Sequence, residues 1–153
     1  MNYRTLLFII LFLYSIGTTS CSLGVPNAAK SNMGKMFPEV TRISWSHENR
    51  HEFEAEFTWQ GSSTSATFDE KGNWKETEQS ITADQLPIAV QEALAEGFAD
   101  FVVHSPEKIT SLEYAIAYEM VVVSKEARVE LLFSPDGSLL RKELLNNDDE
   151  DVD

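Results

Sequence analysis

Cysteine is nearly absent from this chain, since Cys21 is the only one among 153 residues. No disulfide can form within the chain, so its stability must come from packing. Basic residues are also scarce: 12 Lys and Arg stand against 25 Asp and Glu, which gives a formal net charge of −13. Such a chain would repel nucleic-acid phosphates and anionic lipid surfaces. We therefore expect no nucleic-acid partner and no polybasic attachment to membranes.

Long apolar runs are confined to one place near the N-terminus, at Leu6–Tyr14 (LLFIILFLY). Arg4 is the only charged residue before this run, and the small residues Gly17–Ser20 follow it. This order is typical of a secretory signal peptide, and the run is too short to span a bilayer stably. We therefore interpret residues 1–20 as a signal peptide and expect the mature chain to be exported.

The expected cleavage site is followed directly by Cys21. The segment Thr18-Thr19-Ser20-Cys21 resembles a bacterial lipobox, in which the cysteine becomes the acylated first residue, but Thr18 replaces the usual aliphatic residue. We predict lipidation of Cys21 and a lipidated tether over residues 21–25. The alternative is an ordinary signal peptide with a leftover thiol. The predicted location is the periplasm or outer membrane of a Gram-negative bacterium, with lipid anchoring, or otherwise secretion.

The composition of the chain, at 42% hydrophobic and 10% aromatic residues, is sufficient for a packed core. One segment differs from this average composition. Residues 146–153 (NNDDEDVD) are dominated by acids, and a terminal run of like charges is typical of a solvated end. We predict a disordered acidic tail over residues 146–153.

An internal duplication is the most informative pattern. The stretch Phe53–Glu78 aligns without a gap to Tyr118–Glu143, at an offset of 65. The identities are Glu54/Glu119, Phe68/Phe133, Gly72/Gly137 and Glu78/Glu143. The alternation of apolar and polar residues and the Asp/Gly turns also coincide, which predicts two segments of similar structure.

The first predicted unit covers residues 26–81. Pro26 suits a first helical turn, and Ala29, Met33, Met36 and Phe37 recur at helical spacing behind it. Extended segments are predicted at residues 41–46, 51–59, 63–68 and 74–81, where apolar and polar residues alternate or turns intervene.

The second predicted unit covers residues 82–145. Its expected helix has an apolar stripe formed by Leu86, Val90, Leu94, Phe98 and Phe101. Pro106 bars further helix, and His104 beside it is assigned to a loop. Strands are predicted at residues 112–122, 129–133 and 139–144.

The fold class that follows is α+β: two tandem units, each a helix followed by an antiparallel meander, with the helix packed on a roughly four-stranded sheet. The ordered set of motifs, W-x-H, F-E-A-E-F, A-T-F-D-E-K-G-N-W, Y-E-M-V-V and L-L-F-S-P-D-G-S-L-L, resembles the PepSY-like group of exported bacterial proteins. The resemblance implies a tandem fold like that of the beta-lactamase inhibitor protein, and export. It implies no activity, and no binding residue can be transferred from it.

Candidate catalytic and metal-binding residues are few. His47 and His51 are four apart, a spacing that suits zinc on a helix but not at the start of a strand. The Asp69 and Asp136 turns lack the ligands of a calcium loop. The pairs Glu54/Glu56 and Glu76/Glu78 share one strand face each; they form either a cation-attracting surface or, as we favour, a solvated face. We expect no catalytic residue, no metal site and no cofactor.

An asymmetry between the halves indicates a candidate binding face. The outward positions of the second unit are apolar, and a strand that is apolar on both faces must be covered on both. Burial within the chain is one explanation, and an open binding patch is the other. The residues of this candidate face are Trp74, Val121, Val123, Leu132 and Leu140.

These patterns favour an exported, lipid-anchored, non-enzymatic binding protein that binds or inhibits another exported protein through an exposed sheet face. The alternative is a structural or envelope-stress lipoprotein that acts through self-assembly. A third class, an enzyme or metal-dependent factor, has no supporting cluster of residues.

Overall fold

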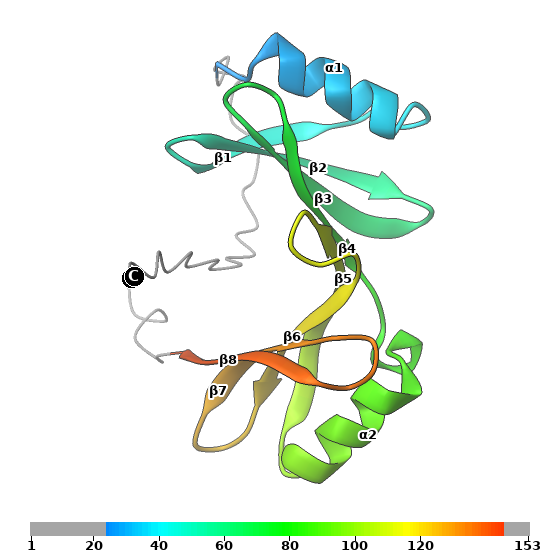
Figure 1. The fold of residues 1–153 in the computed structure, drawn as a ribbon, viewed down its shortest axis with the longest axis vertical. Helices are drawn as coiled ribbons and strands as arrows, with labels where there is room; N and C mark the ends of the chain where they lie inside the picture. Colours follow the sequence, from blue (N-terminus) through cyan, green and yellow to red (C-terminus); the bar gives the residue numbers. More distant parts are fainter. Residues whose placement is uncertain (1–23, 146–153) are drawn as a thin grey trace.

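A computed structural model of the chain describes residues 24–145, so the predicted signal peptide, Cys21 and the predicted tail lie outside the described residues. One antiparallel sheet dominates, and its eight strands follow in chain order (Figure 1). The strands are β1 (Ser44–Asn49), β2 (Glu52–Trp59), β3 (Ser62–Asp69), β4 (Trp74–Ser80), β5 (Val102–Ser111), β6 (Ala117–Val123), β7 (Arg128–Phe133) and β8 (Leu139–Leu145).

Two short α-helices accompany the sheet: α1 (Asn27–Met36) and α2 (Ile88–Gly97). A 3₁₀ turn, η1 (Ala83–Gln85), precedes α2. Each α-helix follows a proline, whose fixed φ favours the first turn and whose missing N–H costs nothing there. Figure 1 shows α1 and α2 near opposite ends of the bent sheet. Among residues 24–145, no helix is long and apolar enough to cross a membrane.

Each helix packs against its own hydrophobic core. Helix α1 buries Ala29 and Met33 against a first core. Helix α2 buries Val90 and Leu94 against a second core, and Phe98 packs at its edge, as the predicted stripe requires. The first core is completed by Phe37, Ala55, Phe57, Ala66 and Phe68, and the second by Leu86, Met120, Val122, Val129, Leu131 and Phe133.

Two glycine turns bring the strands against the helices. Gly72 and Gly137 have φ values of 81° and 84°, a conformation that only glycine adopts without strain. A Cβ atom at Gly72 would lie 2.5 Å from the backbone of Ala28 and Ala29. At Gly137 it would lie 2.5 Å from the Ala89 carbonyl oxygen. The β3–β4 and β7–β8 turns therefore contact the first turns of α1 and α2 only because they carry no side chain.

The prediction of two tandem helix-and-sheet units is wrong. β4 pairs with β5 in antiparallel register, from Glu76 opposite Ser111 to Ser80 opposite Glu107. This pairing joins all strands into one eight-stranded sheet with only two short α-helices. The physical reason is that separate sheets would leave β4 and β5 as unpaired edges, whereas pairing satisfies the backbone groups of both.

The prediction from the sequence is wrong at β5 in particular. Residues 102–111 form a strand through Pro106, whereas the sequence predicts a loop at Pro106 and His104. The strand tolerates the proline because Ser105 takes a positive φ of 44° and the pairing with β6 is irregular between His104 and Glu107. Consequently the predicted strand at 112–122 begins only at Ala117, and residues 112–116 form the turn that joins β5 to β6.

Candidate functional site: the open face of the sheet

The register of the strands divides the sheet into two faces. On β2, Phe53, Ala55 and Phe57 pack toward α1, so the alternating glutamates point to the opposite face. Residues paired directly across neighbouring strands point to the same face of the sheet. Gln79 on the α1 side of β4 pairs with Lys108 on β5, and Lys108 pairs with Tyr118, which packs on the α2 side of β6. Both helices therefore lie on one side of the sheet. We call the other side, which neither helix covers, the open face.

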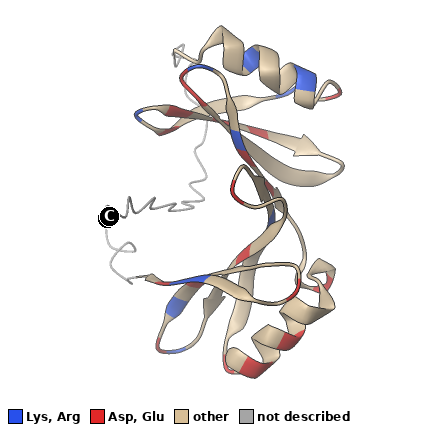
Figure 2. Ribbon diagram, viewed as in Figure 1, with Lys and Arg blue, Asp and Glu red and all other residues tan. Residues whose placement is uncertain are grey.

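Acidic residues follow the open face across the sheet, and Figure 2 shows acidic positions on strands of both halves. In the first half the open face carries Glu54 on β2 and Glu76 and Glu78 on β4, all half-buried. Burial raises the pKa of all three carboxyls, and neighbouring glutamates raise it further. The pKa of Glu78 reaches about 9, because Glu107, Glu76, Glu119 and Glu54 add their charges to its burial.

The second half places three more glutamates on the open face. Glu107, Glu119 and Glu130 are only 7%, 4% and 5% exposed. Glu107 lies directly opposite Glu119 across the β5–β6 pair. Burial raises the pKa of all three carboxyls, and for Glu119 the pKa reaches about 8 through burial and the charge of Glu130, against the opposing effect of Arg141. We refer to Glu54, Glu76, Glu78, Glu107 and Glu119 as the glutamate cluster.

Arg141 on β8 is the cation nearest to this cluster. Its Nη2 atom donates to Glu119 Oε2 at 2.6 Å and to Glu130 Oε1 at 2.7 Å. One guanidinium nitrogen therefore bridges two carboxylates from neighbouring strands through charge-assisted hydrogen bonds. The hydrogen bonding around this bridge is incomplete. Glu107 Oε1 accepts a hydrogen bond from Ser80 at 3.3 Å, but Glu107 Oε2, Glu119 Oε1 and Arg141 Nε are buried without any hydrogen-bond partner.

A small apolar cluster adjoins the glutamates. Ile109, Ala117 and Leu132 are buried together on the open face, with Tyr114 packed beside them. Ile109 is the cross-strand partner of Glu78, and Leu132 is that of Glu119. The open face thus combines a buried apolar cluster with carboxylates that lie beside it.

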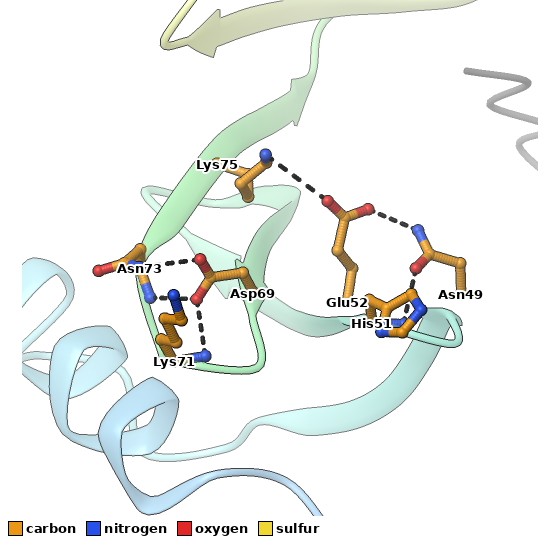
Figure 3. A network of polar contacts seen from close by, with 7 residues as sticks. All are labelled: Asn49, His51, Glu52, Asp69, Lys71, Asn73 and Lys75. Carbon is orange, nitrogen blue, oxygen red and sulfur yellow. Dashed lines mark hydrogen bonds and ion pairs between the residues drawn. The ribbon is translucent and has the colours of Figure 1, made fainter. Parts of the chain in front are cut away.

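A network of polar contacts lies at the β1–β2 and β3–β4 turns (Figure 3). Glu52 accepts a hydrogen bond from Asn49 and has Lys75 Nζ 3.7 Å from its Oε1 atom. Asp69 accepts two backbone hydrogen bonds at 2.8 Å, from Lys71 and Asn73, and so shapes the turn that carries Gly72. These contacts are typical of turn chemistry, so we assign this network a structural role.

The five residues of the predicted binding face do not form one patch. Trp74 lies on the helix side: it pairs with Phe68, packs against the first core and donates to Thr77 Oγ1 at 2.9 Å. Val121 and Val123 are half-buried on the open face, and Leu132 is buried there in the small apolar cluster. Leu140 is 42% exposed at an irregularity of the β7–β8 pair.

His47 and His51 are not brought together, whereas His104 is exposed on β5 opposite Val121 of the open face. The ring of His47 packs on Phe53 with centroids 4.7 Å apart, and His51 Nδ1 lies 3.1 Å from Glu70 Oε1 at the exposed β1–β2 turn. Within residues 24–145, no group of three His, Cys, Asp or Glu side chains is arranged to hold a metal ion.

Sequence reasoning missed Glu107, Glu119, Glu130 and Arg141. A signal was available for two of them. Glu119 and Glu130 are single charges inside the otherwise apolar segments YEMVVV and VELLF, and a charge at such a position is rarely buried unless it is paired. Glu107 carried no such signal, because the strand that contains it was not recognised.

Comparisons with known proteins agree with this architecture. The family model described as "Putative beta-lactamase-inhibitor-like, PepSY-like" matches residues 51–141. A BLIP-like protein from Bacteroides fragilis is 25% identical with a TM-score of 0.73, over 83% of this chain and 91% of that one. A protein from Bacteroides eggerthii, described among "putative periplasmic proteins", is 26% identical with a TM-score of 0.74, over 80% of this chain and 91% of that one.

A DUF2874 family protein from Bacteroides uniformis shares the fold, with 23% identity and a TM-score of 0.73 over 78% of this chain and 88% of that one. A comparison with curated proteins found no match. The family model spans more than half of the chain and includes strands of both cores. The chain therefore belongs to the PepSY-like family of beta-lactamase-inhibitor-like proteins.

Proposed function

We propose that this protein is an exported, non-enzymatic binding protein that holds another exported protein against the open face of its sheet. One observation carries the proposal: the open face runs across all eight strands, neither helix covers it, and it combines an apolar cluster with partly buried carboxylates. A broad antiparallel face of this kind is a surface for macromolecules rather than a pocket for a small substrate.

The relatives support the same role. The family is described as beta-lactamase-inhibitor-like, and a structurally similar protein is described as BLIP-like. Inhibition is an act of binding, so these descriptions favour a binding protein over an enzyme. The description of the Bacteroides eggerthii relative supports a periplasmic location. Within that location, the proposed attachment is an acyl anchor on Cys21, in the periplasm or at the outer membrane.

Site-specific photo-crosslinking tests the proposed binding face. A photoreactive residue is introduced at Ser63 or Ser111, both on the open face. Matched controls carry it at Lys30 on α1 or Glu92 on α2, which are exposed on the helix side. Each purified mature protein is irradiated in periplasmic extract of the source bacterium, and adducts are identified by mass spectrometry.

The proposal predicts adducts with one other exported protein from Ser63 and Ser111 and none from Lys30 or Glu92. Adducts with copies of this chain alone would support self-assembly instead and would contradict the proposal. Adducts that form only from Lys30 or Glu92 would place the binding surface on the helix side of the sheet and would also contradict the proposal.

A further inference from the structure

The glutamate cluster has a cation at each end and none in its middle. Arg141 bridges Glu119 and Glu130 at the β6–β8 end. Lys75 approaches Glu52 near the other end, at 3.7 Å. Among residues 24–145, no Lys or Arg forms an ion pair with Glu78 or Glu107. The nearest lysine in sequence, Lys108, lies in register with Gln79 and Tyr118 and therefore points to the helix side.

Two buried oxygens mark this middle as incomplete. Glu107 and Glu119 are both more than nine-tenths buried, and they face each other directly across two strands. Glu107 Oε2 and Glu119 Oε1 have no hydrogen-bond partner. A buried acceptor without a donor destabilises the folded protein, and the cost is larger when the acceptor is charged. When both are ionised, the two opposed carboxylates also repel each other, so the site gains free energy from a cationic donor that reaches it.

Arg141 shows what kind of donor satisfies this surface. It is a guanidinium that enters from the open face and bonds to carboxylates of two strands at once. Resting on the proposed function, we infer that the partner is a protein segment that inserts an arginine or lysine side chain into the middle of the glutamate cluster, between Glu78, Glu107 and Glu119. Glu107 and Glu119 are almost fully buried, so a long aliphatic stem with a terminal cation is the shape best suited to reach them.

Other occupants fit less well. A second copy of this chain brings another formal charge of −13, and the chain's own residues 146–153 contain five acids and no base. Both would be repelled by the cluster. Within residues 24–145 the acidic side chains are not arranged as metal ligands. A cationic segment of a different protein is complementary in charge, and the acidic field also accelerates its approach.

Tri-arginine amide serves as a defined probe of the cluster, and tri-citrulline amide serves as its uncharged control. Binding to the full mature protein is measured by calorimetry at low salt and pH 9.5, where Glu78 and Glu119 are mostly ionised and arginine keeps its charge. The inference predicts that tri-arginine binds and tri-citrulline does not. The variants Glu107→Gln and Glu78→Gln lower the affinity for tri-arginine at least tenfold. The matched variant Glu56→Gln, an exposed carboxyl on the same face, changes it less than threefold. An equal loss of affinity in all three variants would mean that tri-arginine is attracted by the overall negative charge and not by the cluster. That result would overturn the inference.

The same variants are then combined with the photoreactive residue at Ser111. The inference predicts that Glu107→Gln and Glu78→Gln lower the yield of the adduct with the exported partner at least tenfold, whereas Glu56→Gln leaves it unchanged. Circular dichroism confirms that each variant is folded, and the second cluster variant keeps the test decisive if one fails to fold. An undiminished adduct in folded Glu107→Gln and Glu78→Gln overturns the cationic anchor alone. No adduct from any open-face position overturns the proposed function and the inference with it.

Discussion

Glu107 and Glu119 lie directly opposite each other on β5 and β6, both more than nine-tenths buried, and each keeps one carboxyl oxygen without a hydrogen-bond partner. Folding thus places two acids face to face in the centre of the sheet and provides a full set of donors for neither. Such a pair destabilises the isolated protein when both members are ionised. Its position on the open face is why we connect it with binding.

The stability of the free protein should fall as the pH rises from about 5 to about 9. Burial raises the pKa of Glu48 to about 7, of Glu119 to about 8 and of Glu78 to about 9. Across this window the unfolded chain has released protons that the folded state still holds, so the free energy of unfolding decreases with pH. Each extra proton held by the folded state contributes a slope of about 1.4 kcal/mol per pH unit. Urea unfolding at several pH values measures this slope, and stability that rises with pH across the window would contradict the prediction.

Replacing Arg141 by Met should destabilise the protein. The change leaves Glu119 and Glu130 buried without their cation. Removing one partner of a buried pair costs about 3–5 kcal/mol. Arg141 is one-third exposed, so we expect a loss of about 1–3 kcal/mol in the free energy of unfolding at pH 9, where Glu119 is mostly ionised. Arg128→Met is the matched control, because Arg128 is exposed on the neighbouring strand. It should change stability by less than about 0.5 kcal/mol. Equal effects of the two variants would show that the bridge contributes nothing.

Gly72→Ala and Gly61→Ala should differ, although both glycines have φ values above 80°. At Gly61 the new Cβ meets nothing within 4 Å, so only backbone strain of about 1–2 kcal/mol is expected. At Gly72 the Cβ would lie 2.5 Å from the backbone of α1, which adds about 1–3 kcal/mol of overpacking. Thermal unfolding of the two variants isolates the contact between helix and turn. A Gly72→Ala protein as stable as Gly61→Ala would mean that α1 does not pack as described.

Replacing Cys21 by Ser should release the protein from membranes. The residue lies outside the described residues, so this prediction depends on the lipobox-like sequence alone. Acylation provides the only proposed attachment, and the acidic chain has no attraction for anionic lipid. Fractionation of cells that express each form, with metabolic labelling by a fatty-acid analogue, measures the change. Wild-type protein that is unlabelled and found in the periplasmic fraction would contradict the lipid anchor.

The local pattern of the chain was predictable where one physical cause dominates. Alternation in FEAEFTW predicted β2 and its two faces, and the apolar spacing predicted that Leu94 would be buried on α2. The glycine turns were predictable from composition, but their close contact with the helices was not. That contact depends on where two distant segments meet, and no local pattern encodes it.

The single sheet and the glutamate cluster were not predicted, for a common reason. Because Pro106 argues against a regular strand, the sequence does not predict β5. Without β5, no strand is available to pair with β4. The sequence therefore favours a solvated face for Glu76 and Glu78, with a cation-attracting surface as the alternative. The structure instead places them beside Glu107 and Glu119 at the junction, where neighbouring strands exclude water. Tertiary pairing decided both the topology and the charge state of the surface.

The most direct test is a titration of the glutamate carboxyl carbons by ¹³C NMR, without and with saturating tri-arginine amide. We predict that Glu78 and Glu119 titrate with pKa values of about 9 and 8 in the free protein and that the peptide lowers both. Ordinary carboxyl pKa values near 4.5 in the free protein, or values that the peptide leaves unchanged, would contradict the assignment of this surface to a cationic partner.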